Sequence, residues 1–197
     1  MQKLTASDLL PLEQYARERP VLRARMIEIR RQRQLRIGEH CSWSFEDRDT
    51  VRYQVQEMLR TERIFEPAGI AEELAAYNPL IPDGRNLKAT LLIEYEDPVE
   101  RAKQLVELRG FERHCWIRVA GFEPIHAIAD EDMPRENEVK TSAVHFLRWE
   151  FSAQMVTGLR EGAQLGAGVD HPHYRHSVEP LPAALRGALM ADFALDG

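Results

Sequence analysis

Three histidines within six residues form the densest group of metal-capable side chains in this sequence. They lie in the segment 170–176, Asp-His-Pro-His-Tyr-Arg-His. His171 and His173 are two positions apart, and the proline between them favours an extended backbone in which both imidazoles point to one side. His176 follows in the next turn, and Asp170 can orient an imidazole. Imidazole suits zinc or iron, so we predict a divalent metal at these four residues; the alternative is a polar loop facing water.

A second group of polar side chains lies on elements that should be buried. His145 alternates with Leu147 and Trp149 along a predicted strand, so it should face the core and need a polar partner. The other candidates for a shared pocket are Gln54, Glu57, Arg60, Glu94 and Tyr174. Two carboxylates and a histidine in one cleft can bind a metal or transfer protons. The alternative is a core histidine bonded to a carbonyl or carboxylate, with Glu57 and Arg60 solvated.

Composition is typical of an ordinary globular protein. The 197 residues are enough for one domain with a sizeable core, and the net charge of -6 argues against general nucleic-acid binding. No apolar run approaches the roughly 20 residues that cross a bilayer, and the first residues lack the apolar core of a secretory signal. Cys41 and Cys115 are far apart in sequence, so neither a zinc knuckle nor a disulfide framework is indicated. We expect a reduced, cytoplasmic setting.

Hydrophobic periodicity predicts a single α+β domain over residues 1–197, with a mostly antiparallel sheet covered by helices. Residues 1–34 should form a helical segment packed on it, as one helix or as two broken near Pro20. Period-2 patterns predict about five or six strands; these lie at 35–45, 86–95, 114–120, 124–129, 141–151 and 164–169. Helices are expected at 48–63, after Pro67, at 98–108 and at 181–195, and a helix or strand through Leu159. Residues 130–134 form an acidic loop.

Arginines are concentrated in the N-terminal helical segment. They are Arg17, Arg19, Arg23, Arg25, Arg30, Arg31, Arg33 and Arg36. Such a stripe can contact phosphates, but no aromatic residues interleave for base stacking and the whole chain is acidic. A solvated, salt-bridged face or a contact between protein chains is the favoured interpretation.

Several stretches together resemble a bacterial family known only as a domain of unknown function. They are 45–51 (FEDRDTV), 54–60 (QVQEMLR), 77–82 (YNPLIP), 89–94 (ATLLIE), 142–147 (SAVHFL) and 170–172 (DHP). The resemblance covers nearly the whole chain. The resemblance implies that the gene for this protein lies beside genes for a rubrerythrin-like protein and an iron–sulfur oxidoreductase. The family pattern includes Asp170, His171 and Tyr174 rather than His173 or His176, which favours a pocket shared by Glu57, Glu94, His145 and His171.

These observations lead to three hypotheses about function. The first is a cytosolic accessory protein of redox, iron–sulfur or oxidative-stress metabolism that binds a ligand or a partner, such as a rubrerythrin-like or iron–sulfur protein. The second is a metal-binding protein or metal-dependent enzyme that uses histidine and carboxylate ligands. The third is nucleic-acid binding through the arginine-rich helix. A homodimer is compatible with all three.

Overall fold

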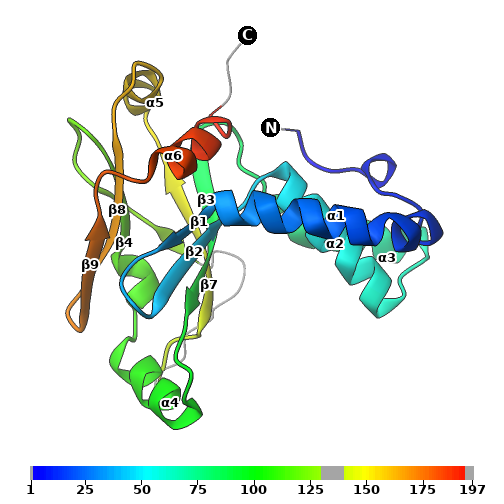
Figure 1. The fold of residues 1–197 in the computed structure, drawn as a ribbon, viewed down its shortest axis with the longest axis horizontal. Coiled ribbons are helices and arrows are strands. Elements are labelled where there is room, and N and C mark those ends of the chain that lie inside the picture. The colour runs from blue at the N-terminus through cyan, green and yellow to red at the C-terminus, as the bar shows by residue number, and fades with distance from the viewer. Residues whose placement is uncertain (1, 130–139, 194–197) are drawn as a thin grey trace.

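Nine strands, within the part of the chain that the structure describes, form two antiparallel sheets in this computed structural model (Figure 1). The described residues are 2–129 and 140–193. The first sheet has the order β1 (Gln34–Arg36), β2 (Cys41–Phe45), β3 (Asn86–Ile93), β7 (Val144–Glu150) and β6 (Ile128–Ala129). The second has the order β5 (Ile125–His126), β4 (Cys115–Val119), β8 (Leu165–His171) and β9 (Tyr174–Val178). The predicted α+β class is confirmed, but the strands form two sheets where one was expected. The predicted acidic loop 130–134 lies outside the described residues.

The helices of the described residues divide between a projecting arm and the sheets (Figure 1). We call α1 (Leu12–Gln32), α2 (Arg48–Glu62) and α3 (Pro67–Tyr77) the helical arm. The sheets are accompanied by α4 (Pro98–Glu107), α5 (Ala153–Arg160) and α6 (Ala183–Met190). Short 3-10 turns are η1 (Ala6–Asp8), η2 (Asn78–Leu80) and η3 (Phe111–His114). None of the described helices is both long and apolar enough to cross a membrane.

The main hydrophobic core lies between the two sheets. Buried and partly exposed residues alternate along β7, as expected for a strand with one face on a core. Trp43 of β2 packs against Trp149 of β7 with ring centroids 4.8 Å apart. The indole N–H of Trp149 donates to the backbone carbonyl of Cys115 in the second sheet at 3.3 Å. Both sheets therefore contribute to one continuous core.

The helical arm has a smaller core of its own. Val51, Val55 and Leu59 are four residues apart on α2 and form one buried stripe. This stripe packs with Leu74 of α3 and Ile81. The apolar stripe of α2 is therefore buried within the helical arm itself.

The predicted strand at 35–45 is instead a hairpin. Leu35 and Trp43 are register partners of β1 and β2, so the chain reverses between them. Gly38 lies at this reversal with a φ of 69°, a left-handed conformation that glycine adopts without a steric penalty. The alternation of apolar and polar residues hid this turn in the sequence, because the apolar residues on both sides of Gly38 face the same core.

Of three other elements, one matches an alternative that the sequence left open and two differ from the prediction. α1 runs unbroken through Pro20, so the one-helix alternative is correct. The strand predicted at 164–169 continues as β8 to His171, and the extended backbone expected from 171 to 173 is instead the turn at Pro172 and His173 that leads into β9. The last helix is shorter than the predicted 181–195 and ends at Met190.

Arg33 joins the helical arm to the sheets and is buried at 4% exposure. Its guanidinium donates to the backbone carbonyls of Phe45 and Ala188, at 3.0 Å each. It also bonds the carboxylate of Asp192 and lies 3.4 Å from that of Asp47. Arg33 was expected in a solvated arginine stripe; it is instead the centre of a buried ionic group linking α1, β2 and the segment after α6.

Candidate functional site

The hairpin of β8 and β9 carries the predicted metal ligands. His171 and Tyr174 are paired across the strands, and Pro172 and His173 form the two-residue turn. His171 is buried at 4% exposure. Its Nδ1 accepts from the backbone N–H of His173 at 3.3 Å, and its Nε2 therefore donates to the carbonyl of Arg109 at 3.2 Å. Both ring nitrogens of His171 are thus used within the protein, and the ring is neutral.

Acid should destabilise the protein through His171. Burial, first of all, lowers the pKa of His171 below its usual 6.5. Its neutral form therefore contributes stability above that value, and this contribution is lost as the pH falls through the folded-state pKa. Urea unfolding between about pH 7 and about pH 5 should show a steeper loss for the wild type than for His171→Ala. Equal slopes in the two proteins would contradict the buried neutral ring.

Asp170 joins two histidines that the sequence analysis did not select. His114 Nδ1 lies 3.0 Å from one carboxylate oxygen of Asp170, and His126 Nε2 lies 3.2 Å from the other. Burial raises the pKa of Asp170, but the hydrogen bonds from His126 and His114 outweigh it, and the net shift is downward. Residues distant in sequence form this group because β4 pairs with both β5 and β8. No sequence spacing could have revealed it.

The predicted four-residue metal site is not assembled by this hairpin. Asp170 and His171 are adjacent on a strand and so point to opposite faces. The ring of His176 packs on Tyr174 at 4.6 Å between centroids, while that of His173 lies 5.8 Å from His171. Among residues 2–129 and 140–193, no three histidine, cysteine, aspartate or glutamate side chains are placed to hold a metal ion. The described positions therefore do not support the predicted metal.

Tyr174 serves as a link between the two sheets. Its hydroxyl donates to the carbonyl of Ile37 at 2.7 Å and accepts from the backbone N–H of His40 at 3.0 Å. Burial raises the pKa of Tyr174 to about 12. The hydroxyl approaches the β1–β2 turn so closely that a Cβ on Gly38 would lie 2.5 Å from it. Tyr174 is therefore neutral and fully bonded.

His145 is buried on the core face of β7, as predicted, with 0% exposure. Its Nε2 lies 2.8 Å from the hydroxyl of Thr141 and 3.0 Å from the carbonyl of Ser142. The nearby carboxylate is that of the buried Glu112, 3.9 Å away. This arrangement matches the alternative of a core histidine with a carbonyl and a carboxylate, rather than a pocket shared with Glu57 and Glu94.

Replacing His145 by alanine should lower the free energy of unfolding by about 1–3 kcal/mol, since Thr141 and Glu112 would lose a buried partner. Urea denaturation measures this difference directly. His173→Ala, at an exposed position of the hairpin turn, is the control and should change stability by no more than about 0.5 kcal/mol. Equal effects of the two substitutions would contradict the assigned network.

The other pocket candidates belong to separate places. Glu57 lies in the helical arm, where it accepts from the Tyr15 hydroxyl at 2.7 Å and from two guanidinium nitrogens of Arg19. The hydrogen bonds from Arg19 lower the pKa of Glu57 to about 2. Arg60 is 3.5 Å from the same carboxylate. Glu94 is exposed, directly follows β3, and accepts a hydrogen bond from the hydroxyl of Ser42. Gln54, next to Tyr77, also lies in the arm. The structure does not bring these residues to His145.

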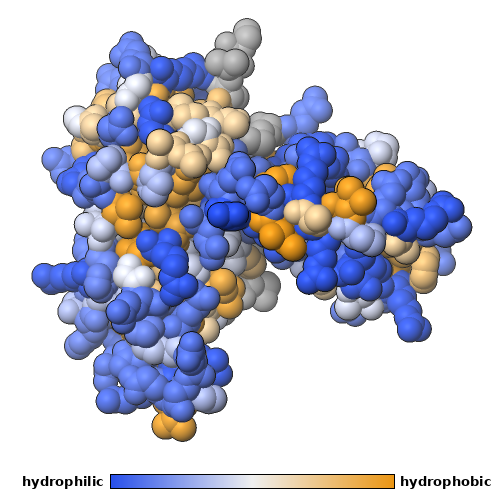
Figure 2. Space-filling model, in the orientation of Figure 1, coloured by the Kyte–Doolittle hydropathy of each residue, from blue (hydrophilic) through white to orange (hydrophobic). Residues whose placement is uncertain are grey.

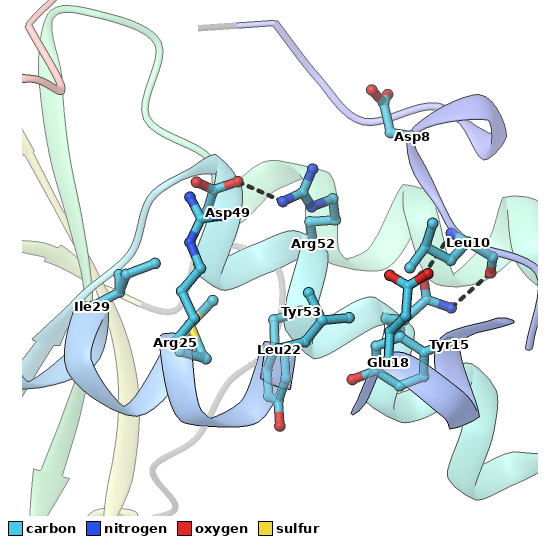
Figure 3. A pocket seen from close by; sticks show the side chains of 12 residues that line it. Asp8, Leu10, Tyr15, Glu18, Leu22, Arg25, Ile29, Asp49, Arg52 and Tyr53 are labelled. Atoms are coloured by element: carbon cyan, nitrogen blue, oxygen red, sulfur yellow. Dashed lines mark hydrogen bonds and ion pairs between the residues drawn. The ribbon is translucent and has the colours of Figure 1, made fainter. Parts of the chain in front are cut away.

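The helical arm contains a cavity of about 250 Å³ between α1, α2 and the N-terminal segment (Figure 3). Its apolar lining residues are Leu10, Leu22, Met26 and Ile29, and its polar ones Asp8, Tyr15, Glu18, Arg25, Asp49, Arg52, Tyr53 and Gln56. Gln56 closes one end by bonding both backbone groups of Leu10, at 2.9 and 3.1 Å. Arg52 is paired with Asp49 at 2.9 Å. Arg25 has no ion-pair partner in the described part of the chain. We call this cavity the arm cleft.

Comparisons with known proteins identify relatives without adding an activity. A family model described as "Protein of unknown function (DUF3501)" matches residues 3–193. The chain is also similar to a crystal structure of a novel protein of unknown function from Burkholderia pseudomallei K96243. The two are 45% identical with a TM-score of 0.90, over 98% of this chain and 100% of that chain. No curated protein matches the sequence.

Proposed function

The chain belongs to DUF3501, a family of unknown function, so we propose a function from the geometry of this chain alone. We propose that it is an accessory protein that binds an acidic segment of a partner protein in the arm cleft. The observation that carries this proposal is the cleft itself. It combines an apolar lining with the guanidinium of Arg25, which has no ion-pair partner among the described residues, on an arm that projects from the sheets (Figure 1). A concave apolar site with a few polar groups is the usual form of a binding site.

The charge of α1 favours an acidic partner. α1 has six arginines and three glutamates, in a chain whose net charge is -6. Arg17 and Arg31 pair with glutamates of the same helix, but Arg23 and Arg25 make no ion pair within the described residues. Unpaired cations near an apolar surface attract and orient an acidic chain.

Two further apolar side chains of α1 are exposed outside the cleft. Val21 and Ile27 of α1 are 74% and 60% exposed. Figure 2 shows apolar patches on the arm among mainly hydrophilic neighbours. Partner surfaces commonly combine such apolar anchors with arginine, so both features support protein binding over binding of a small polar ligand.

We propose that the protein acts in redox metabolism. It does so by binding a redox partner and not by reactions of its own thiols. Cys41 and Cys115 are both buried and free. Burial raises the pKa of Cys41 to about 12 and raises that of Cys115 as well, which disfavours the reactive thiolate. The resemblance of the sequence supports a rubrerythrin-like or iron–sulfur protein as the partner.

Titration calorimetry with the rubrerythrin-like protein and the iron–sulfur oxidoreductase of the same organism tests this proposal. We expect one of them to bind with micromolar affinity that weakens as salt is added. Arg25→Glu should weaken binding at least tenfold. Arg17→Glu makes the same charge change on the same helix outside the cleft, at a side chain 72% exposed, and should have a smaller effect. Absence of binding by both partners, or equal effects of the two variants, would contradict the proposal.

A further inference from the structure

The strand β9 forms an open edge of the second sheet. It comes last in the strand order and, among the described strands, pairs with β8 alone. Arg175, His176 and Ser177 in the middle of β9 are all exposed. Figure 1 shows β9 at the outer side of the molecule, away from the helical arm. Another strand can therefore approach this edge.

The backbone groups of Arg175 and Ser177 point out from this edge. In an antiparallel pair, residues that bond the neighbouring strand alternate with residues whose N–H and carbonyl point the other way. His171 and Tyr174 flank a two-residue turn and therefore bond each other. The alternation then directs the N–H and carbonyl of Arg175 and Ser177 away from β8. Within the described part of the chain, no other backbone group bonds them.

The other edges of the two sheets are shorter than β9. β1 has three residues and β5 and β6 have two each, whereas β9 has five. Proteins protect long edges with prolines, bulges or lysines, because an open edge can pair with another chain. β9 pairs with β8 over five consecutive positions without a bulge, and it contains neither proline nor lysine. Of the sheet edges in the described residues, β9 is thus the one suited to pairing with a further strand.

The sequence of β9 is complementary to a second copy of itself. If two copies pair antiparallel with the twofold axis at His176, Arg175 lies opposite Ser177 of the second copy, and Tyr174 lies opposite Val178 of the second copy. The outward backbone groups of Arg175 and Ser177 bond each other in this register. An aromatic side chain meets a β-branched one at each end, and no like charges face each other. An axis nearer the turn would set Arg175 against itself, and one nearer the other end would run the pairing off β9.

Apolar surface beside β9 enlarges this contact. Tyr174 is buried and Val178 is partly buried, and both pack with the main core. Figure 2 shows apolar side chains on the surface next to β9, towards α6 and β1. Pairing of the two edges brings these surfaces of both copies close to the twofold axis. Removing part of them from water favours association.

We propose that the protein forms a symmetric homodimer in which β9 pairs with β9 of a second copy, so that one continuous sheet runs through both copies. Such a twofold contact uses the same patch of each chain and closes on itself. It is small beside the roughly 1,600 Å² of a standard interface, so we expect a micromolar dissociation constant. β9 lies away from the arm, so both arm clefts stay open in the dimer (Figure 1). The dimer does not depend on the proposed partner binding.

Sedimentation equilibrium of the full chain tests the association, over concentrations from about 1 to about 500 µM that bracket a micromolar dissociation constant. We expect the mass of one chain at the low end and of two chains at the high end. Ser177→Pro removes an outward N–H that β8 does not use, and it should weaken dimerisation at least tenfold. Ser177→Ala keeps that N–H and is the control, so its dissociation constant should stay within twofold of the wild type. Circular dichroism shows whether each variant is folded.

Disulfide cross-linking tests the register, and it decides the question even if Ser177→Pro does not fold. In the proposed register the Cα atoms of the two His176 residues are about 4.5 Å apart across the axis, within the span of a disulfide. Those of the two Arg175 residues are diagonal to each other and roughly 8–9 Å apart, beyond that span. With the thiol oxidant diamide, His176→Cys should therefore give disulfide-linked dimers and Arg175→Cys should not. The native Cys41 and Cys115 are buried, so the wild type is the blank.

Three results would overturn the proposed dimer. The first is a chain that remains a monomer at the highest concentration. The second is a dimer that Ser177→Pro, when folded, leaves as tight as Ser177→Ala does. The third is cross-linking of Arg175→Cys as efficient as that of His176→Cys. A monomer whose β9 amides gain protection from hydrogen exchange only when another protein is added would show that the edge pairs with a different chain, and it would equally overturn the proposal.

Discussion

Replacing Arg33 by alanine is expected to lower the free energy of unfolding by about 3–5 kcal/mol, among the largest effects of any single change in this protein. Arg33 has 4% exposure, and its removal leaves the buried carboxylate of Asp192 without its cation. It also leaves the backbone carbonyls of Phe45 and Ala188 without their donor. Urea denaturation monitored by fluorescence measures the difference.

Two matched variants separate the ionic group from general effects of losing an arginine. Arg31→Ala removes a guanidinium that is 80% exposed and paired only along its helix, so stability should change by no more than about 0.5 kcal/mol. The double variant Arg33→Leu, Asp192→Leu removes both charges of this pair, so neither is left buried without its partner. It should therefore be more stable than Arg33→Ala. An Arg33→Ala protein as stable as Arg31→Ala would contradict the assigned role.

The pH dependence gives an independent check on Asp192. Burial raises the pKa of Asp192 to about 6, although Arg33 favours its charged form. A folded-state pKa above the usual 3.8 means that this group makes the protein less stable as the pH rises from about 4 to about 6. Without Arg33 the folded-state pKa should rise further, so in Arg33→Ala the decline should continue to higher pH.

Gly38→Ala is expected to destabilise the protein by about 2–4 kcal/mol, through backbone strain and crowding together. The φ of 69° at Gly38 disfavours any side chain. A Cβ there would also lie 2.5 Å from the hydroxyl of Tyr174 and 2.8 Å from the ring of His176. The substitution should therefore break the hydrogen bonds by which Tyr174 links the two sheets.

Gly187→Ala is the control for this prediction. Gly187 lies on an exposed position of α6, where an added Cβ would have no neighbouring side chain within 4 Å. Alanine has the higher helix propensity, so this change should stabilise the protein by about 0.5–1 kcal/mol. Thermal unfolding of both variants checks the opposite signs, and a stabilised Gly38→Ala would refute the close approach of Tyr174.

Features that depend on local pattern could be predicted from the sequence alone. Alternation along 86–95 and 141–151 predicted β3 and β7, and it placed His145 in the core, where it lies. Pro67 and Pro98, which suit the first turn of a helix, marked the starts of α3 and α4. These features are local because a side chain's face is set by the period of its own element.

Which polar residues meet depends on the tertiary structure and could not be predicted in this way. The charge of Arg33 resembled that of its exposed neighbours, and its burial depends on Asp192, which lies 159 positions away. The meeting of His114, His126 and Asp170 depends on the pairing of β4 with β5 and β8, and strand pairing is not encoded in the spacing of any one segment. Glu57, Glu94 and His145 looked like one pocket in sequence but are bonded to three different sets of neighbours. Local periodicity sets the face on which a side chain lies, whereas its partners are set by contacts between distant segments.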